Sequence, residues 1–266
     1  MKIVVPVKQI AALDEDFELL DDGTGVNPDY LDYELNEWDD FSYEEALRIM
    51  EANEEEAIEV VPVTVGPEEA DDALRRCLAK GGERGIRVWA DAIEGSDPGA
   101  IAGILAKVVE REQPDIVLAG TLSSDHSFAQ TGMILAARLG WSHMAVVNHL
   151  ELKPGDAKAT IHRELEGGLE EKMTIDLPAV LTIQLGINEP RYASLRGIKQ
   201  AKNKEIEVLS HEDIGLTDDD VGVKGSLSRV RRMLVPEKGQ AEIIEGTSAE
   251  KAARLTEIIK ELKGVA

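Results

Sequence analysis

The sequence predicts an α/β fold with a doubly wound, mostly parallel sheet, and two observations carry that prediction. Short apolar runs at residues 3–7, 58–65, 85–90 and 116–119 have the composition of strands that are buried on both faces. Helical patterns of about 10–15 residues separate them, which is typical of βαβ units. From about residue 146, shorter runs between Pro, Gly and Asp turns predict additional strands, some of them antiparallel.

The helices are placed by their start signals. Ser42, with Glu45 three residues later, predicts a capping box and therefore a helix that begins there. Pro67 and the Asp97-Pro98 pair predict the starts of the next two helices. A fourth helix is expected over residues 128–139. The polar stretch of residues 14–40 is too long for a simple connection, and such loops are usually functional or mobile.

Composition excludes several classes of function. The chain has 266 residues, with 29 Lys and Arg against 52 Asp and Glu, and a formal net charge of -23. This charge argues against binding to nucleic acid and to anionic membrane surfaces. No apolar run is long enough for membrane insertion, and the N-terminus lacks the pattern of a signal peptide. A single cysteine, Cys77, excludes an internal disulfide. A cytoplasmic protein is expected, and the acidity fits either an ordinary solvated surface or adaptation to high salt.

The segment of residues 120–132 is the first candidate binding site. It follows a buried strand and opens a helix, so hydroxyls, backbone N–H groups and a helix N-terminus converge there, as a phosphate requires. It matches neither GxGxxG nor a Walker A loop. The alternative is an ordinary strand-to-helix loop with Ser and Asp caps. Asn36 and Asp39 precede another helix and can reach a ligand or serve as turn and cap residues.

Catalytic machinery is not indicated. Asp125, His126 and Ser127 have the residue types of a hydrolytic triad, but adjacent residues seldom face one another. The five histidines lack metal-ligand spacing. Cys77 lies on the apolar face of its helix and is expected to be a small buried hydrophobe.

Residues 188–202 form a basic segment within an acidic chain. Three apolar residues there, Tyr192, Leu195 and Ile198, alternate with Arg191, Arg196, Lys199 and Lys202. An apolar anchor surrounded by charge is typical of a docking patch. The alternative is a short surface helix whose Leu195 covers its own core. Residues beyond about 186 are poor in core-forming side chains, which predicts an arm that packs on another subunit and ends in an amphipathic helix over residues 248–263.

Several segments together resemble the beta subunit of electron transfer flavoproteins, the FixA family. The strongest pair is Arg-Glu-Leu-Glu-Gly-Gly-Leu-Glu at residues 163–170 and Asn-Glu-Pro-Arg-Tyr-Ala at residues 188–193. The sequence Leu-Pro-Ala-Val-Leu-Thr at residues 177–182 adds to it. The resemblance extends from Met1 to about Val208. It implies a Rossmann-like fold akin to adenine nucleotide alpha hydrolases, with residues 1–185 as the nucleotide-binding domain, 186–204 as a partner-recognition loop and 205–266 as an arm on the alpha subunit.

The resemblance also implies the cofactors and their residues. An alpha subunit would hold most of an FAD, and this chain would hold AMP or, in an electron-bifurcating member, a second FAD. The chain itself would be a non-catalytic carrier subunit, because redox chemistry belongs to the flavin. The residues implied for nucleotide binding are Pro6, Lys8, Asn36, Asp39, Val65, Gly120, Ser123, Asp125, Ser127, Phe128, Ala129, Gln130 and Thr131.

The implied partners follow in the same way. Electrons would come from an acyl-CoA dehydrogenase-like flavoenzyme, as in fatty acid beta-oxidation, and pass to a membrane-linked quinone or Fe–S oxidoreductase. Leu195 would anchor the dehydrogenase, and Arg191, Tyr192, Arg196, Ile198 and Lys199 would surround that contact. Two other hypotheses stay open: an ATP-binding sensor or hydrolase of similar fold, and a pure interaction module.

Overall fold

The computed structural model describes all residues except 14–16, 236–238, 240, 242 and 264–266. Its strands are β1 (Lys2–Pro6), β2 (Gln9–Leu13), β3 (Leu31–Leu35), β4 (Glu59–Val65), β5 (Arg84–Val88), β6 (Ile116–Gly120), β7 (Ser142–Glu151), β8 (Lys158–Leu165), β9 (Leu169–Asp176), β10 (Ala179–Ile183) and β11 (Glu205–Leu209). Its α-helices are α1 (Glu37–Glu51), α2 (Asp71–Lys80), α3 (Pro98–Glu112), α4 (Thr131–Leu139), α5 (Leu195–Ala201), α6 (Gly222–Gly225) and α7 (Ser248–Lys263).

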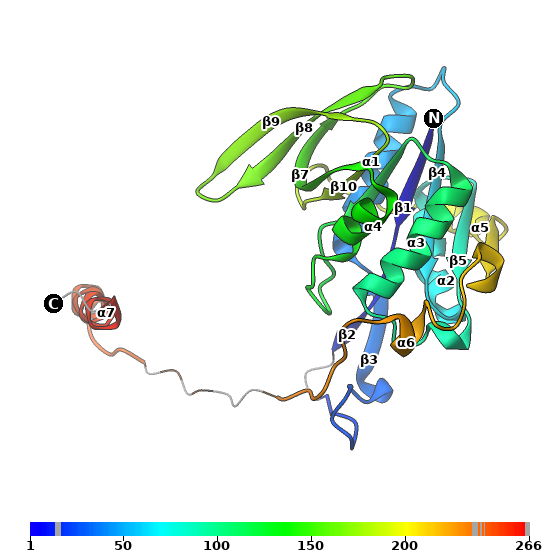
Figure 1. Cartoon of the computed structure of the whole chain (residues 1–266). Coiled ribbons are helices and arrows are strands. Elements are labelled where there is room, and N and C mark those ends of the chain that lie inside the picture. The colour runs from blue at the N-terminus through cyan, green and yellow to red at the C-terminus, as the bar shows by residue number, and fades with distance from the viewer. Residues whose placement is uncertain (14–16, 236–238, 240, 242, 264–266) are drawn as a thin grey trace.

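Nine of these strands form one sheet in the order β11-β5-β4-β1-β6-β10-β7-β8-β9. Every neighbouring pair from β11 to β7 is parallel, and β8 and β9 continue the sheet in antiparallel fashion. The antiparallel strands extend away from the helices in Figure 1. The predicted fold class, a mostly parallel α/β sheet with added antiparallel strands, is confirmed.

Helices cover both faces of the sheet, which accounts for the continuous apolar strands. In β1, Ile3 and Val5 join a buried cluster with Tyr43 and Leu47 of α1, whereas Val4 joins a second cluster with residues of α3 and α4. A strand alternates its side chains between faces, so a strand with a helix layer on each side needs apolar residues throughout. Figure 1 shows α3 and α4 on the near face and α1 on the far one.

The position of β1 decides where a ligand can bind. The chain proceeds from β1 to β4 and β5 on one side, and then crosses to β6 on the other side. The parallel strands all end at the same edge, so β1, β4 and β6 present their carboxyl ends together. A crevice opens at such a reversal because the connections leave in opposite directions.

Three local predictions are wrong. Helix α1 starts at Glu37 with Asn36 as its N-cap, and Ser42 lies inside it with its hydroxyl donating to the Trp38 carbonyl. Three acidic residues in the first turn favour the earlier start through the helix dipole. The stretch of residues 14–40, expected to be a loop, contains β3, which pairs with β2 in an antiparallel ribbon. Helix α4 starts at Thr131 rather than at residue 128.

The sheet also extends beyond the predicted domain end at residue 185. Strand β11 pairs in parallel with β5 as the edge strand, so the structure places residues 205–209 in the sheet and not in an arm. The side chains of its short run Ile-Glu-Val-Leu are only partly buried. The run therefore lacks the continuous apolar composition by which the other strands were predicted. Helix α7 lies apart from the sheet in Figure 1. Among the described helices, none combines the length and apolar character needed to cross a membrane.

Candidate functional site

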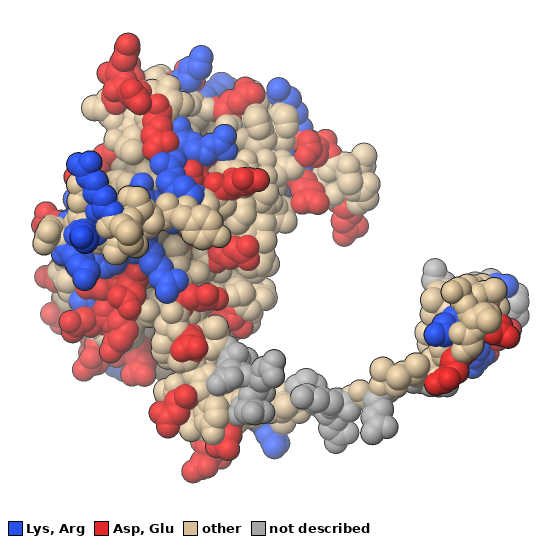
Figure 2. Space-filling view, turned by 180° about the vertical axis from the view of Figure 1, so that it is seen from behind, with Lys and Arg blue, Asp and Glu red and all other residues tan. Residues whose placement is uncertain are grey.

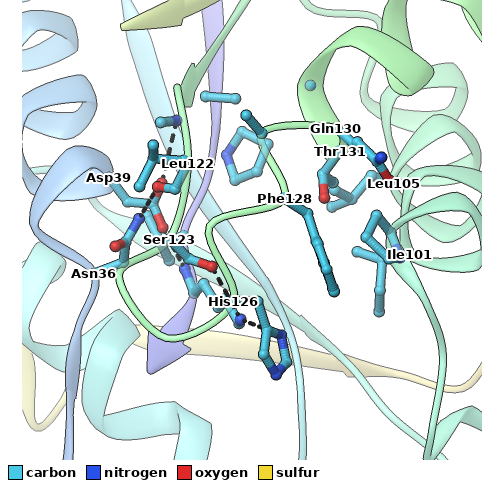
Figure 3. A pocket seen from close by; sticks show the side chains of 18 of the residues that line it. Asn36, Asp39, Ile101, Leu105, Leu122, Ser123, His126, Phe128, Gln130 and Thr131 are labelled. Atoms are coloured by element: carbon cyan, nitrogen blue, oxygen red, sulfur yellow. Dashed lines mark hydrogen bonds between the residues drawn. The ribbon is translucent and has the colours of Figure 1, made fainter. Parts of the chain in front are cut away.

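A cavity of about 230 Å³ opens at the carboxyl ends of β1, β4 and β6. Its walls come from these strand ends, the first turn of α1, the loop between β6 and α4, and the first two turns of α3 (Figure 3). This is the crevice that the strand order creates. The cavity therefore lies where the sequence places the 120–132 segment and Asn36.

Asp39 holds two strand ends together at the base of the cavity. Its carboxylate accepts the Lys8 N–H at 2.8 Å and the Gly120 N–H at 3.1 Å. Gly120 is required at this contact, because a Cβ there would overlap Asp39. Burial raises the pKa of Asp39 to about 7, although both backbone hydrogen bonds, one with Asn36 and the charge of Lys8 lower it. Asp39 is therefore a structural brace between these two segments in the wall of the cavity.

Asn36 fixes the loop that follows β6. Its side chain is buried, its amide nitrogen donates to the Leu122 carbonyl at 2.9 Å, and its amide oxygen accepts the Ser124 N–H at 3.4 Å. A helix N-cap residue would usually bond its own helix. Asn36 instead bonds the loop after β6, on the other side of the cavity. Helix α1 therefore has no side-chain cap.

Lys8 is committed to the same loop. Its ammonium donates to Asp125 at 2.7 Å and to the Ser123 hydroxyl at 3.2 Å, and it lies 3.3 Å from His126 Nδ1. Burial raises the pKa of Asp125, but the bonds from Lys8 and Ser123 outweigh burial and the net shift is downward. Burial and the Lys8 charge lower the pKa of His126. The cation is thus neutralised by Asp125, and a neutral His126 faces the cavity.

The segment just before α4 has unusual backbone geometry, and its Ser127 N–H donates to the Ser123 carbonyl at 2.7 Å. Ser127 and Ala129 both have a φ of 52°, the left-handed region that ordinary residues seldom adopt. Alternation of right- and left-handed residues turns successive N–H groups toward one point and forms an anion-binding concavity. Helix α4 begins directly afterwards, and its N-terminus carries no side-chain cap. Donors and helix dipole together suit a phosphate.

The opposite wall is apolar. Ile101 and Leu105 of α3 line it, together with Val63 and Val65 at the end of β4. Phe128 projects toward these residues in Figure 3 and is 51% exposed, a high value for an aromatic side chain. Its ring centre lies 5.5 Å from that of His126. Phe128 and the aliphatic side chains thus line the same cavity, and an apolar lining with an aromatic face is the kind of surface on which a flat ring packs.

Most of the predicted nucleotide residues line the cavity. They are Pro6, Lys8, Asn36, Asp39, Val65, Gly120, Ser123, Phe128, Ala129, Gln130 and Thr131. Asp125 and Ser127 do not line it: Asp125 pairs with Lys8, and the Ser127 hydroxyl donates to the Ser123 carbonyl. Sequence reasoning missed Ser96, Pro98, Ile101 and Leu105. The Asp97-Pro98 helix start was a usable signal, because helices that follow parallel strands begin at the ligand edge.

The geometry gives no support to the hydrolytic triad. His126 Nδ1 faces the Lys8 ammonium, and the hydroxyl of Ser127 is directed to a backbone carbonyl. Cys77 is fully buried, and burial raises the pKa of its thiol well above the usual range. No cluster of His, Cys, Asp and Glu suited to a metal occurs among the residues that the structure describes.

The predicted docking residues lie on the side of the sheet that α1 and α2 cover. Helices α3 and α4 cover the other side. Tyr192 is 99% exposed and Leu195 is 83% exposed, and Ile198, Arg196 and Lys199 are also exposed. Figure 2 shows blue side chains gathered around tan ones on its left side, where α5 lies. The short surface helix of the alternative prediction is present as α5, but Leu195 does not cover its own core, so that part of the alternative is wrong. Arg191 differs from the other docking residues because Glu44 and Glu51 pair with it.

Comparison with known proteins gives consistent matches. The family model for the electron transfer flavoprotein domain matches residues 25–214. The chain is 58% identical over 264 residues to the electron transfer flavoprotein subunit beta of Methylophilus methylotrophus, covering 99% of this chain and 100% of that protein. It is 41% identical over 218 residues to the Bradyrhizobium diazoefficiens subunit beta, covering 81% and 84%. The human subunit beta is 34% identical over 260 residues, covering 97% and 98%.

Proposed function

Since the chain belongs to the beta-subunit family of electron transfer flavoproteins, we propose that it works as a heterodimer with an alpha subunit that holds most of one FAD. Its role in electron transfer follows from the family. FAD supplies the redox chemistry when bound. The residues of this chain would bind a nucleotide, support the fold next to the flavin subunit and dock the electron donor. No described group in the cavity is arranged as a nucleophile with its base.

We propose AMP as the ligand of the cavity. The left-handed Ala129 and the uncapped start of α4, which line the cavity, suit its phosphate, and Phe128 with Ile101 suits its adenine. Lys8 is held by Asp125, so the phosphate would rest mainly on neutral N–H groups. A volume of about 230 Å³ is below the range of roughly 300–1,000 Å³ usual for ligand pockets, which favours a mononucleotide over a second FAD.

The observation that carries this proposal is the phosphate cradle at the strand crossover. We expect the complex with the alpha subunit to be yellow and to release one FAD and one AMP per heterodimer on denaturation, as measured by mass spectrometry. Two flavins and no AMP would instead identify an electron-bifurcating subunit. A stable, colourless monomer after co-expression with the alpha subunit would contradict the proposal.

The proposed donor is an acyl-CoA dehydrogenase-like flavoenzyme, and the proposed acceptor is a membrane-linked quinone or Fe–S oxidoreductase in a cytoplasmic setting. The exposed Leu195 supports the docking role, because an exposed apolar side chain within a basic rim is typical of an interface anchor. Leu195→Ala should slow electron transfer from the dehydrogenase about tenfold or more, as truncation of an anchor does. Flavin content should not change. An unaltered rate would remove Leu195 from the docking surface.

An ATP-binding sensor or hydrolase is the candidate from another class. The loop hydroxyls and the fold would allow it, but the cation nearest the cavity, Lys8, is paired with Asp125. Steady ATP turnover by the purified heterodimer, abolished with loss of the Ser127–Thr131 cradle, would favour this reading over the carrier.

A further inference from the structure

Helix α1 carries three acidic residues that face the docking segment, here defined as residues 188–199. Glu44 and Glu45 are buried, and Glu51 follows Glu44 by two helical turns on the same side. None of the three lines the nucleotide cavity. Buried carboxylates are costly unless they are paired, so their partners define their purpose.

Arg191 is the main partner. Its Nε and Nη2 both donate to Glu44, the latter at 2.8 Å to Oε1, and its backbone N–H donates to Glu44 Oε2 at 3.2 Å. Its Nη2 also donates to Glu51 Oε2 at 2.9 Å, and Nη1 bonds Glu51 Oε1. Both carboxylates raise the pKa of the guanidinium further. All three guanidinium nitrogens of Arg191 therefore bond to carboxylates of the same chain.

Asn188 provides a second tie to α1. It is buried, and its amide nitrogen donates to Glu45 Oε2 at 2.9 Å and to the Phe41 carbonyl at 3.1 Å. The start of the docking segment is thus bound to one face of α1 by two side chains three residues apart.

The other end of the segment is held by α2. Gly197 packs so closely on α2 that a Cβ would overlap the Ala79 carbonyl oxygen. Arg75 donates to the carbonyls of Ala201 and Lys204, each at 2.6 Å, where α5 ends. Tyr192 and Leu195 project between these two supports.

We propose that Glu44 and Glu51 are positioning residues that hold the docking segment in its binding conformation, and that Arg191 is their internal anchor rather than a contact to the electron donor. This inference rests on the docking role proposed above. A preordered segment loses less conformational entropy on binding, and this raises affinity without adding any contact to the partner. The charge for steering would then come from Arg196 and Lys199, whose side chains are exposed.

Hydrogen exchange of the intact heterodimer tests the ordering. Glu44→Gln and Arg191→Lys should each speed exchange of the amides of residues 189 and 191–195 at least about tenfold, the effect of losing one charge-assisted hydrogen bond. The double variant should exchange no faster than Arg191→Lys alone, because Arg191 makes the contact to Glu44 as well as the contact to Glu51. Glu54→Gln, the same charge change at an exposed site after α1, should have no effect.

Electron transfer from an acyl-CoA dehydrogenase tests the consequence. Both single variants should raise KM for the heterodimer at least about tenfold with kcat unchanged, and the double variant should match Arg191→Lys. Arg191→Lys keeps the positive charge but cannot reproduce the fork, so it separates anchoring from charge. Additive KM effects in the double variant, or a larger effect of Arg191→Lys than of Glu44→Gln and Glu51→Gln combined, would show a direct contact to the donor and overturn the inference.

The docking role of Leu195 and the positioning role of Glu44 and Glu51 can be contradicted separately. Unchanged hydrogen exchange in Glu44→Gln and Glu51→Gln would overturn the positioning role even if Leu195→Ala slows transfer. Faster exchange with an unchanged KM would overturn it as well, since an ordered segment would then be irrelevant to docking. The pairs of Glu44 and Glu51 with Arg191 and of Glu45 with Asn188, here called the clamp, lie outside the cavity. Loss of AMP or FAD from the variants would therefore also contradict the proposal.

Discussion

Individual side chains in the cavity act mainly on the backbone of this protein. Asp39, Asn36 and Lys8 each reach across from one element to tie down the loop after β6. The nucleotide proposed above would then be held by backbone donors and by Phe128. This division explains why residues that suggest acid–base chemistry in the sequence carry none in the structure.

Asp39 makes the stability of the protein depend on pH. Its pKa is about 7 in the folded chain, against an ordinary value of 3.8. Between these two pH values the Asp39 carboxyl is ionised in the unfolded chain but still protonated in the folded chain. The free energy of unfolding therefore falls as pH rises, and it becomes constant above about pH 7. Relative to Asp39→Asn, the wild-type free energy of unfolding should fall by roughly 1 kcal/mol per pH unit between pH 5 and 7. Urea unfolding of the complex at several pH values checks this; a constant difference would contradict it.

Phe128 should govern retention of the nucleotide. Phe128→Ala removes the ring face, and stacking of a base on an aromatic side chain is worth about 1–3 kcal/mol. We expect AMP affinity to fall about tenfold or more, with FAD unchanged, as measured by nucleotide release during gel filtration. Phe128→Tyr, which keeps the ring, is the control and should retain AMP.

At the scale of elements, the start of α4 depends on strained backbone. Two residues with Cβ atoms, Ser127 and Ala129, adopt the left-handed region just before the helix, and this delays the helix by three residues relative to the pattern in the sequence. Strain of this kind persists where the surroundings enforce it and is common at binding sites. Asn36, Lys8 and Asp125 supply that enforcement.

Ala129→Gly should relieve part of this strain. Glycine adopts a positive φ freely, so the substitution should stabilise the apo protein by up to about 1 kcal/mol in spite of the larger entropy of its unfolded chain. Gly140→Ala is the control that should introduce the same strain and destabilise the protein. Gly140 ends α4 with a φ of 66°, and a Cβ there would lie in open space. Thermal unfolding should move the two variants in opposite directions. A destabilised Ala129→Gly would show that Ala129 is not strained.

The contact between α5 and α2 sets where the docking segment lies. Gly197→Ala should displace α5, because a methyl group there would meet the Ala79 carbonyl. We expect slower electron transfer from the dehydrogenase with the nucleotide retained, checked by steady-state kinetics and by AMP content. Gly155→Ala, at a turn where a Cβ has open space, controls for general loss of stability. Full activity of Gly197→Ala would show that α5 tolerates displacement.

For the whole molecule, the nucleotide cavity and the docking segment share one support. Helix α1 contributes Asn36 and Asp39 to the cavity at its N-terminal end, and Glu44, Glu45 and Glu51 to the clamp further along. The C-terminal part of the chain differs, because it exposes large apolar side chains. These are Leu227, Val230, Leu234, Val235, Ile243, Leu255, Ile259 and Leu262.

The exposed arm is expected to bind the alpha subunit. Apolar side chains in such number outside the core mark an interaction surface. A chain that ends after residue 228 keeps the sheet, the cavity and the docking segment, and it should fail to co-purify with the alpha subunit. Removal of α7 alone should weaken the complex less. Stable association of the shorter chain, measured by analytical gel filtration, would contradict the role of the arm.

The sequence by itself determined the parallel sheet and the region of the cavity, since these follow from local apolar runs and from residues adjacent in the chain. Ile3–Val5 and the 120–132 segment could be read in this way. Only the tertiary structure decided that Asp39 braces two strands, that β11 closes the sheet edge, and that Glu44 engages Arg191 almost 150 residues later. Those roles depend on contacts between distant segments, which no local pattern of polarity records.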